Sequence, residues 1–277
     1  MIRKRWSVPG GVLMILVAAG VASPAAAQTE QQAIDWCDNE NGTFSPDQRI
    51  SGCSALIRAN AKDYAAFVSR GLAYYEKDDY DHAIADFTQA IQIDPKQAPA
   101  LYNRGLAYYE KDDFDHAIAD YTQAIQIDPK DPDQYNGRAN AYDAKKDYAH
   151  AIADYAKVVT LDPKNADGFN SRCWDEVLVG QLQPALADCN RAVALESDNA
   201  EYLDSRGLTY LRLGQFDKAI ADYNAALKQD AKLASSLYGR GFAKLKKGDA
   251  AGGNADMAAA KAIKSDIADD MAAAGVK

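Results

Sequence analysis

The chain has 277 residues and a formal net charge of −9, because 40 acidic residues stand against 31 basic ones. Phosphate groups are bound by clustered Lys and Arg, so this balance argues against nucleic acid and anionic membrane surfaces as partners.

The first 27 residues have the organisation of a secretory signal peptide. The segment "MIRKRW" is basic, "GGVLMILVAAGVA" is apolar, and the small residues Ala25 and Ala27 precede a possible cleavage site before Gln28. The apolar run is shorter than the roughly 20 residues that span a bilayer. We therefore expect residues 1–27 to be removed, with an uncleaved membrane anchor as the alternative. The mature chain would then be periplasmic or secreted, without membrane association.

Residues 28–63 are expected to form a divergent copy of the repeats that follow. The segment "DQRISGCSALI" at 47–57 aligns with "DHAIADFTQAI" at 81–91, although Arg49 and Gly52 replace the small and acidic residues usual at their positions.

From residue 64 the sequence repeats with a period of 34 residues. The segment "RGLAYYEKDDYDHAIADFTQAIQIDPK" at 70–96 recurs at 104–130 with two substitutions. An Arg and an Asp recur in step through six repeats that occupy residues 64–267. These pairs are predicted to be structural ion pairs rather than catalytic groups: Arg70 and Asp86, Arg104 and Asp120, Arg138 and Asp154, Arg172 and Asp188, Arg206 and Asp222, and Arg240 and Asp256.

Each repeat is predicted to be a helical hairpin. In the second repeat Leu101, Gly105 and Tyr108 fall on one helical stripe, and a second stripe with Ala117 and Tyr121 follows the polar break "EKDDFD". The motifs "IDP" and "LDP" end the second helix, because a residue before Pro is disfavoured in the α region.

This pattern resembles the tetratricopeptide repeat family. The resemblance is carried by the period of 34 and by Gly71, Tyr74, Ala83, Phe87, Ala90 and Pro95. It implies an all-α fold, a right-handed α-solenoid of tandem 34-residue helical hairpins whose first helices line a concave groove. The fourth repeat departs from the pattern at Cys173 and Glu176, and the sixth departs at Lys244 and Gly253. Residues 268–277 are expected to form a C-terminal capping helix or tail, as solenoid ends require.

The four cysteines fall into two pairs with the same spacing. Cys37 and Cys53 are 16 residues apart, as are Cys173 and Cys189, and both pairs occupy the eighth and twenty-fourth positions of a repeat. Because those positions face each other in a hairpin and an export signal precedes them, two disulfides are favoured over free buried thiols. The close Cys spacing of zinc sites is absent.

No residue pattern points to catalysis or to a cofactor. His82, His116 and His150 also recur at the period of 34, and equivalent residues of stacked helices lie about 10 Å apart, too far to share one metal. The repeated carboxylates are typical of turns and helix N-caps. Since no nucleophile elbow or phosphate loop is present, we expect a non-enzymatic protein without cofactor or metal.

The resemblance also implies which side chains face the groove. The candidates for partner binding are Tyr75, Tyr102, Tyr109, Asn136, Asn140, Asn170, Trp174, Tyr238 and Phe242. Asp143, Val177 and Leu211 occupy further groove positions, and the alternative for any of them is packing against the adjacent repeat. Family members that grip carboxyl termini use basic and Asn side chains at the fifth position, where this chain has residues such as Tyr102 and Asp204. A carboxylate-gripping activity is therefore not supported.

The expected function is a protein–protein interaction scaffold of the periplasm or cell envelope, which binds a peptide segment or helix of a protein partner in its groove. Aromatic side chains supply rigid contact area, and Asn can both donate to and accept from a peptide backbone. The alternative is a periplasmic carrier of a small ligand, which would require a closed apolar pocket.

Overall fold

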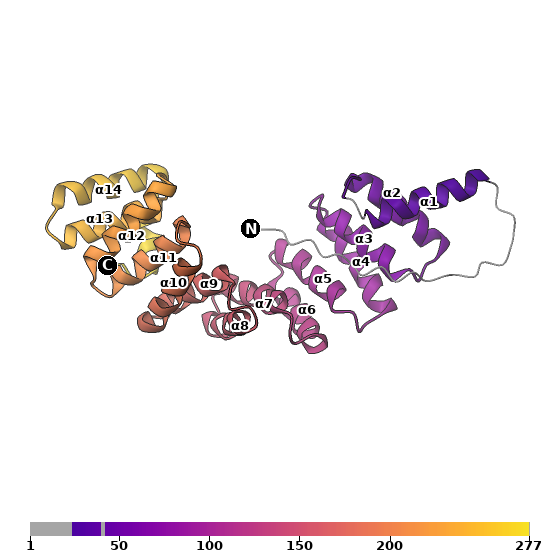
Figure 1. Cartoon of the computed structure of the whole chain (residues 1–277), viewed down its shortest axis with the longest axis horizontal. Helices are drawn as coiled ribbons and strands as arrows, with labels where there is room; N and C mark the ends of the chain where they lie inside the picture. The colour runs from indigo at the N-terminus through magenta and orange to yellow at the C-terminus, as the bar shows by residue number, and fades with distance from the viewer. Residues whose placement is uncertain (1–23, 40–41, 277) are drawn as a thin grey trace. The chain divides into compact units, whose positions relative to one another are not determined.

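The computed structural model describes residues 24–39 and 42–276, and the secondary structure of this part is entirely helical (Figure 1). The helices are α1 (Pro24–Asp38), α2 (Pro46–Ala59), α3 (Tyr64–Tyr75), α4 (Tyr80–Ile93), α5 (Ala98–Glu110), α6 (Phe114–Ile127), α7 (Pro132–Ala144), α8 (Tyr148–Leu161), α9 (Ala166–Leu178), α10 (Leu182–Leu195), α11 (Ala200–Arg212), α12 (Phe216–Gln229), α13 (Ala234–Lys246), α14 (Ala250–Ile263) and α15 (Ile267–Ala273). Consecutive helices pack as hairpins, which confirms the all-α fold of tandem helical hairpins.

Helix boundaries follow the repeated polar residues. Asp63, Asp79 and Asp147 are N-caps whose carboxylates accept a hydrogen bond from the backbone N–H three residues later. Helices α4, α6 and α8 end just before an Asp-Pro motif, at Ile93, Ile127 and Leu161. One residue of each connecting turn has a left-handed backbone: Asp78, Asp112, Lys146, Gly180, Gly214 and Gly248.

The two helices of a hairpin approach closely where a glycine faces an aromatic ring. A Cβ atom on Gly71 would lie 2.7 Å from Cε1 of Phe87, and one on Gly207 would lie 2.8 Å from Cε1 of Tyr223. Both rings are fully buried. Any larger side chain at these glycines would therefore push the paired helices apart.

The chain divides into two compact units, residues 1–127 and 128–277. In the first unit, Phe67, Val68 and Phe87 belong to one hydrophobic cluster formed by α3, α4 and α5. In the second unit, Ile267 and Met271 of α15 join a cluster with helices α9 to α14. The short α15 thus covers apolar surface at the C-terminal end of that unit.

The predicted signal peptide lies mostly outside the described residues, which begin with α1 at Pro24. Helices α1 and α2 pack together and are joined by the Cys37–Cys53 disulfide, so the segment predicted as a divergent repeat has the hairpin form of the other repeats. Among the described helices, none has the length and apolar character needed to cross a bilayer.

Candidate functional site

The repeated Arg and Asp form a two-point ion pair in each of the six hairpins. Nε of Arg104 donates to Oδ2 of Asp120 at 2.7 Å, and its Nη2 donates to Oδ1 at 2.7 Å. The Asp120 side chain is only 4% exposed. The other five hairpins contain the same pair.

Several of these guanidinium groups also connect neighbouring hairpins. Nη1 of Arg104 donates to Oγ1 of Thr88 in the preceding hairpin at 3.0 Å, and Nη1 of Arg240 donates to Oδ1 of Asn224 at 2.8 Å. Sequence reasoning missed this contact. The available signal was a short polar residue, such as Thr88 or Asn224, one position after the aromatic residue of the second helix.

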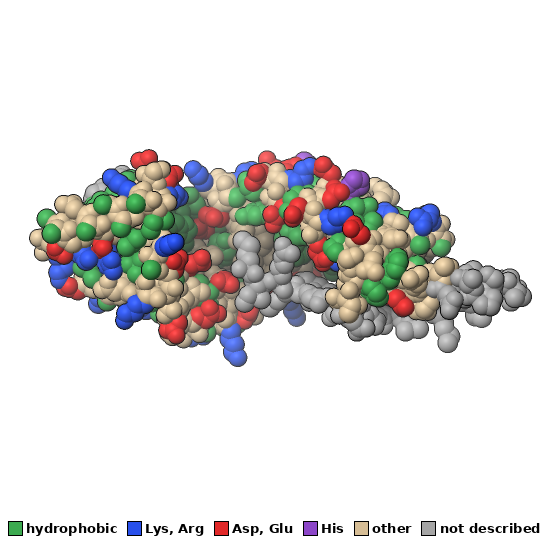
Figure 2. Space-filling view, turned by 90° about the horizontal axis from the view of Figure 1, so that it is seen from above, with side chains coloured by type: hydrophobic (Ala, Val, Ile, Leu, Met, Phe, Trp, Pro, Cys, Tyr) green, Lys and Arg blue, Asp and Glu red, His purple; other side chains and the backbone are tan. Residues whose placement is uncertain are grey.

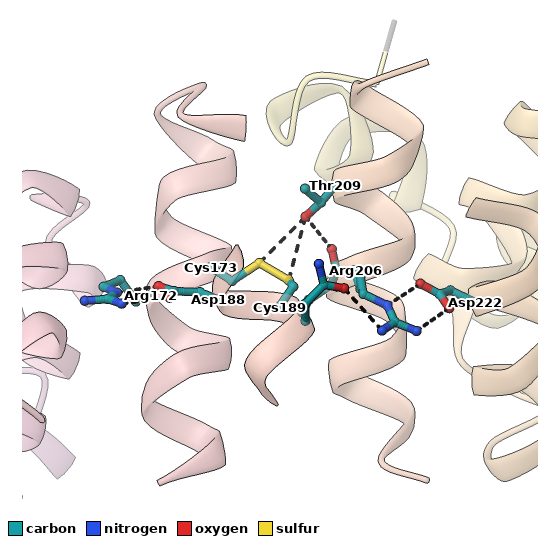
Figure 3. The surroundings of a disulfide bond; sticks show 9 residues. Arg172, Cys173, Asp188, Cys189, Arg206, Thr209 and Asp222 are labelled. Carbon is teal, nitrogen blue, oxygen red and sulfur yellow. Dashed lines mark hydrogen bonds and ion pairs between the residues drawn. A yellow bond between two sulfur atoms is a disulfide. The ribbon is translucent and has the colours of Figure 1, made fainter. Parts of the chain in front are cut away.

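Both cysteine pairs are disulfide-bonded and buried. The Cα atoms of Cys37 and Cys53 are 4.7 Å apart, and those of Cys173 and Cys189 are 5.5 Å apart. Figure 3 shows the second disulfide beside Oγ1 of Thr209, which lies 3.7 Å from both sulfur atoms. The disulfides occupy the positions that a glycine and an aromatic ring occupy in other repeats, so a covalent link replaces that packing.

Three tyrosines of the first unit lie half-buried on its first helices, α3 and α5, and we call them the N-terminal first-helix face: Tyr75, Tyr102 and Tyr109. The hydroxyl of Tyr75 donates to Oε1 of Glu110 at 3.0 Å. The rings of Tyr102 and Tyr121 are 5.7 Å apart. These contacts hold the aromatic groups in place before any partner binds.

The predicted binding residues of the second unit lie on α7, α9 and α13, and we call them the C-terminal first-helix face: Asn136, Asn140, Asn170, Trp174, Tyr238 and Phe242. Asn140 accepts a hydrogen bond of 2.6 Å from the hydroxyl of Tyr155. Oδ1 of Asn170 is buried and has no hydrogen-bond partner among the described residues. The C-terminal first-helix face thus contains amide side chains as well as aromatic rings, whereas the N-terminal first-helix face is formed by tyrosines.

Some side chains expected in the groove contribute to the core. Val177 is fully buried and Leu211 is 5% exposed, both within the large cluster of the second unit. Trp174, Tyr238 and Phe242 are half-buried and pack against the same cluster. One side of each of these three rings is therefore anchored while part of it remains accessible.

Carboxyl groups are buried along the first helices of the second unit, which sequence reasoning missed. Asp175 is 1% exposed, and burial, followed by the adjacent Asp143 carboxylate, raises its pKa to about 9. Burial raises the pKa of Glu176 to about 7. Burial also raises the pKa of Asp204 to about 6, although the hydroxyl of Ser236 donates to this carboxylate at 2.5 Å.

The three histidines stand at the surface near the starts of α4, α6 and α8. Nδ1 of His82 lies 2.8 Å from Oδ2 of the N-cap Asp79, and its ring stacks on Tyr74 with centroids 4.9 Å apart. His116 and His150 repeat this arrangement. Within the described residues, no group of three His, Cys, Asp or Glu side chains is placed to hold a metal ion.

Solved structures share the fold of this chain. YrrB, described as a TPR protein with an unusual peptide-binding site, is 25% identical with a TM-score of 0.56, covering 65% of this chain and 93% of its own. A tetratricopeptide repeat protein from Parabacteroides merdae is 19% identical with a TM-score of 0.65, covering 89% of this chain and 99% of its own. PilF of Pseudomonas aeruginosa is 16% identical with a TM-score of 0.63, covering 74% and 95%.

Sequence profiles identify the repeats directly. The profile described as tetratricopeptide repeat matches residues 98–131 and 132–165, and the one described as TPR repeat matches residues 71–112 and 207–248. No curated protein matches the chain significantly in sequence. The repeat profiles, the helical hairpins and the similar solved structures agree. The chain belongs to the tetratricopeptide repeat family.

Proposed function

We propose that the mature chain is a non-enzymatic scaffold that binds a peptide segment or helix of another protein through its first-helix faces. The observation that carries this proposal is the set of half-buried aromatic and amide side chains at equivalent positions of the first helices α3, α5, α7, α9 and α13. Such groups combine rigid contact area with hydrogen-bonding capacity. The similarity to YrrB, a protein with a peptide-binding site, supports the same assignment.

We place this scaffold in the periplasm or cell envelope. The basic, apolar and small-residue order of residues 1–27 is that of an export signal. The two buried disulfides fit an oxidising compartment, because such bonds are rare where thiols are kept reduced. Mass spectrometry of the chain purified from an envelope fraction should give a mature N-terminus at Gln28. Recovery of the uncleaved chain from the cytoplasm would contradict this location.

The alternative function of small-ligand carrier has weaker support. A hollow of about 460 Å³ lies at the turn between α11 and α12, and its lining includes Asp217, Lys218 and Lys247. Carrier sites are predominantly apolar and enclose most of their ligand. Charged side chains at an exposed turn do not provide such a site.

Site-specific photo-cross-linking tests the proposed binding surface. A photoreactive residue at Trp174 or Tyr102 should form adducts with the same partner protein in the native compartment. Matched probes at Gln123 of α6 and Gln183 of α10, which are exposed on second helices, should not. Adducts of equal yield from the second helices would overturn the proposal.

Once the partner segment is known, the difference between its affinities for the wild type and for a Trp174 variant measures how much the indole ring contributes to binding. Trp174→Ala should weaken binding by about 2 kcal/mol, because a large aromatic at the centre of an interface carries much of the binding energy. Gln183→Ala is the matched control and should bind as the wild type does. Isothermal titration calorimetry would check both values, and an unchanged affinity of the Trp174 variant would count against the surface.

A further inference from the structure

The N-terminal first-helix face consists of aromatic and aliphatic side chains without an amide. Leu72 and Leu106 lie three residues before Tyr75 and Tyr109, so each pair shares one side of its helix, and all four side chains are half-buried. The residue equivalent to Leu72 and Leu106 in the third repeat is Asn140. The face of the first unit therefore offers apolar ring surface but no amide side chain for the backbone of a bound peptide.

Proline is the residue type that suits such a face. Most extended peptides bring a backbone N–H at every residue, and a donor that loses water without finding an acceptor weakens binding. Proline has no backbone N–H. Proline-rich segments also adopt the polyproline II helix before they bind, which lowers the entropic cost of docking on an aromatic surface. A proline-rich segment therefore matches this face better than other extended segments do.

The rings of the face are held in the same way in two successive hairpins. The ring of Tyr75 meets that of Tyr80 edge-on with centroids 5.4 Å apart, and the rings of Tyr109 and Phe114 are also 5.4 Å apart. The hydroxyl of Tyr75 donates to Glu110, the residue after Tyr109, at 3.0 Å and so links α3 to α5. These contacts orient both rings before a partner arrives, which reduces the side-chain entropy lost on binding.

The spacing of the two hairpins matches the period of a polyproline II helix. Helices α3 and α5 contact each other, and helices in contact lie about 8–10 Å apart. Equivalent residues such as Tyr75 and Tyr109 are therefore separated by about the same distance. A polyproline II helix rises about 3.1 Å per residue with three residues per turn, so its residues recur on one side every ~9 Å. Prolines three residues apart can thus pack on both tyrosines at once.

The charged groups beside the face are already paired within the chain. Figure 2 shows hydrophobic side chains exposed among acidic and basic ones. Glu76, at the end of α3, lies 2.8 Å from Nη1 of Arg49, and Glu110, at the end of α5, accepts from Tyr75. Because these carboxylates have partners, the tyrosine rings rather than the charges define the ligand of this face.

We propose that the N-terminal first-helix face binds a proline-rich segment of the partner protein in the polyproline II conformation. Two prolines in a Pro-x-x-Pro arrangement pack on the rings of Tyr75 and Tyr109. This inference rests on the proposed function, because it names the class and the conformation of the segment that the scaffold binds.

The test selects a phage-displayed library of random dodecapeptides against the disulfide-bonded chain 28–277. Clones that also bind a Tyr75→Leu/Tyr109→Leu variant are removed, and the remaining clones should be enriched in Pro-x-x-Pro. A synthetic peptide from this set should bind the double variant about tenfold more weakly than the wild type, because two aromatic anchors are lost. Inserting one alanine between its prolines should weaken binding to the wild type to a similar extent, because the prolines then fall on different sides of the helix.

Two further variants separate the rings from other causes. Tyr75→Phe/Tyr109→Phe keeps both rings and should bind the peptide within about twofold of the wild type. Tyr108→Leu removes a half-buried tyrosine of the same helix α5, whose ring stacks on His116, and should have an equally small effect. Circular dichroism and thermal melting would establish that the variants are folded.

The outcomes separate this inference from the proposed function. Peptides that depend on the two rings but lack the Pro-x-x-Pro spacing would overturn the inference and leave the scaffold intact. Equal binding of the original and the alanine-inserted peptide would do the same. Peptides that bind the wild type and the double variant equally, and that cross-link only to the C-terminal first-helix face, would also overturn it without removing the scaffold. Failure to select any peptide above background would overturn both.

Discussion

The buried carboxyl of Asp175 makes stability depend on pH. Burial and Asp143 raise its pKa to about 9, whereas an unfolded Asp has a pKa of about 4. The folded state therefore binds an extra proton between about pH 4 and pH 9, and this contribution to stability is lost as the pH rises through that window.

The substitution Asp175→Asn should remove the loss of folding stability that occurs as the pH rises. The amide cannot ionise and can donate to Asp143, so the variant should be more stable than the wild type at pH 9 by about 1–3 kcal/mol. Below pH 4 the difference should be small. Urea unfolding at a series of pH values would measure the gap, and a gap independent of pH would contradict the assignment. Asp198→Asn is the control for a simple change in net charge.

At the scale of the hairpin, the Cys173–Cys189 disulfide substitutes for glycine–aromatic packing. Thr209 of the next hairpin lies against both sulfur atoms. In the repeats where the preceding hairpin has an aromatic ring instead of the disulfide, the position of Thr209 is an alanine: Ala107 follows Phe87, and Ala243 follows Tyr223. The hydroxyl-bearing side chain fills space that a ring takes up elsewhere. Reducing the bond should lower the free energy of unfolding by about 3 kcal/mol, as expected for a short closed loop.

A triple exchange tests this equivalence. Cys173→Gly, Cys189→Phe and Thr209→Ala together copy the arrangement of Gly71, Phe87 and Ala107, so this variant should fold and resist reducing agents. Cys173→Ala/Cys189→Ala is the control, and it should be less stable because it leaves a cavity. Equal melting temperatures of the triple and double variants would show that the ring does not fit the site.

The connecting turns offer a second test at this scale. Lys146 has a left-handed backbone with φ of 61°, whereas Gly180, Gly214 and Gly248 stand at the equivalent turn positions. Residues other than glycine are destabilised by about 1 kcal/mol in the left-handed backbone region. Lys146→Gly should therefore raise stability by up to about 1 kcal/mol, and Gly214→Lys should lower it by a similar amount. Chemical denaturation would measure both, and a change of the same sign in both would refute the explanation.

Across the whole chain, the sequence period predicted which residues are equivalent but not how deeply each is buried. Strict register was enough to predict the hairpins, and the Arg and Asp pairs and both disulfides lie where it placed them. Asp175 and Glu176 interrupt the pattern, yet only packing shows that these carboxyls are buried rather than solvated. Val177 and Leu211 fit groove positions by spacing but lie in the core, because neighbouring helices cover them.

The sequence period also could not predict the contacts that Arg side chains make outside their own repeat. Arg104 bonds both Asp120 in its hairpin and Thr88 in the preceding one. A contact between repeats depends on how the hairpins stack, which the period of one repeat does not specify. Arg70, Arg104, Arg206 and Arg240 thus contribute to the nearest-neighbour interactions on which solenoid stability depends.

Hydrogen–deuterium exchange of the mature, disulfide-bonded chain with and without its partner segment tests the central claim most directly. If the chain is a scaffold, binding should slow exchange in the first helices α3, α5, α7, α9, α11 or α13, around the N-terminal and C-terminal first-helix faces. Exchange in the second helices α4, α6, α8, α10 and α12 should remain unchanged. Protection confined to the second helices, or to the turn between α11 and α12, would contradict the account.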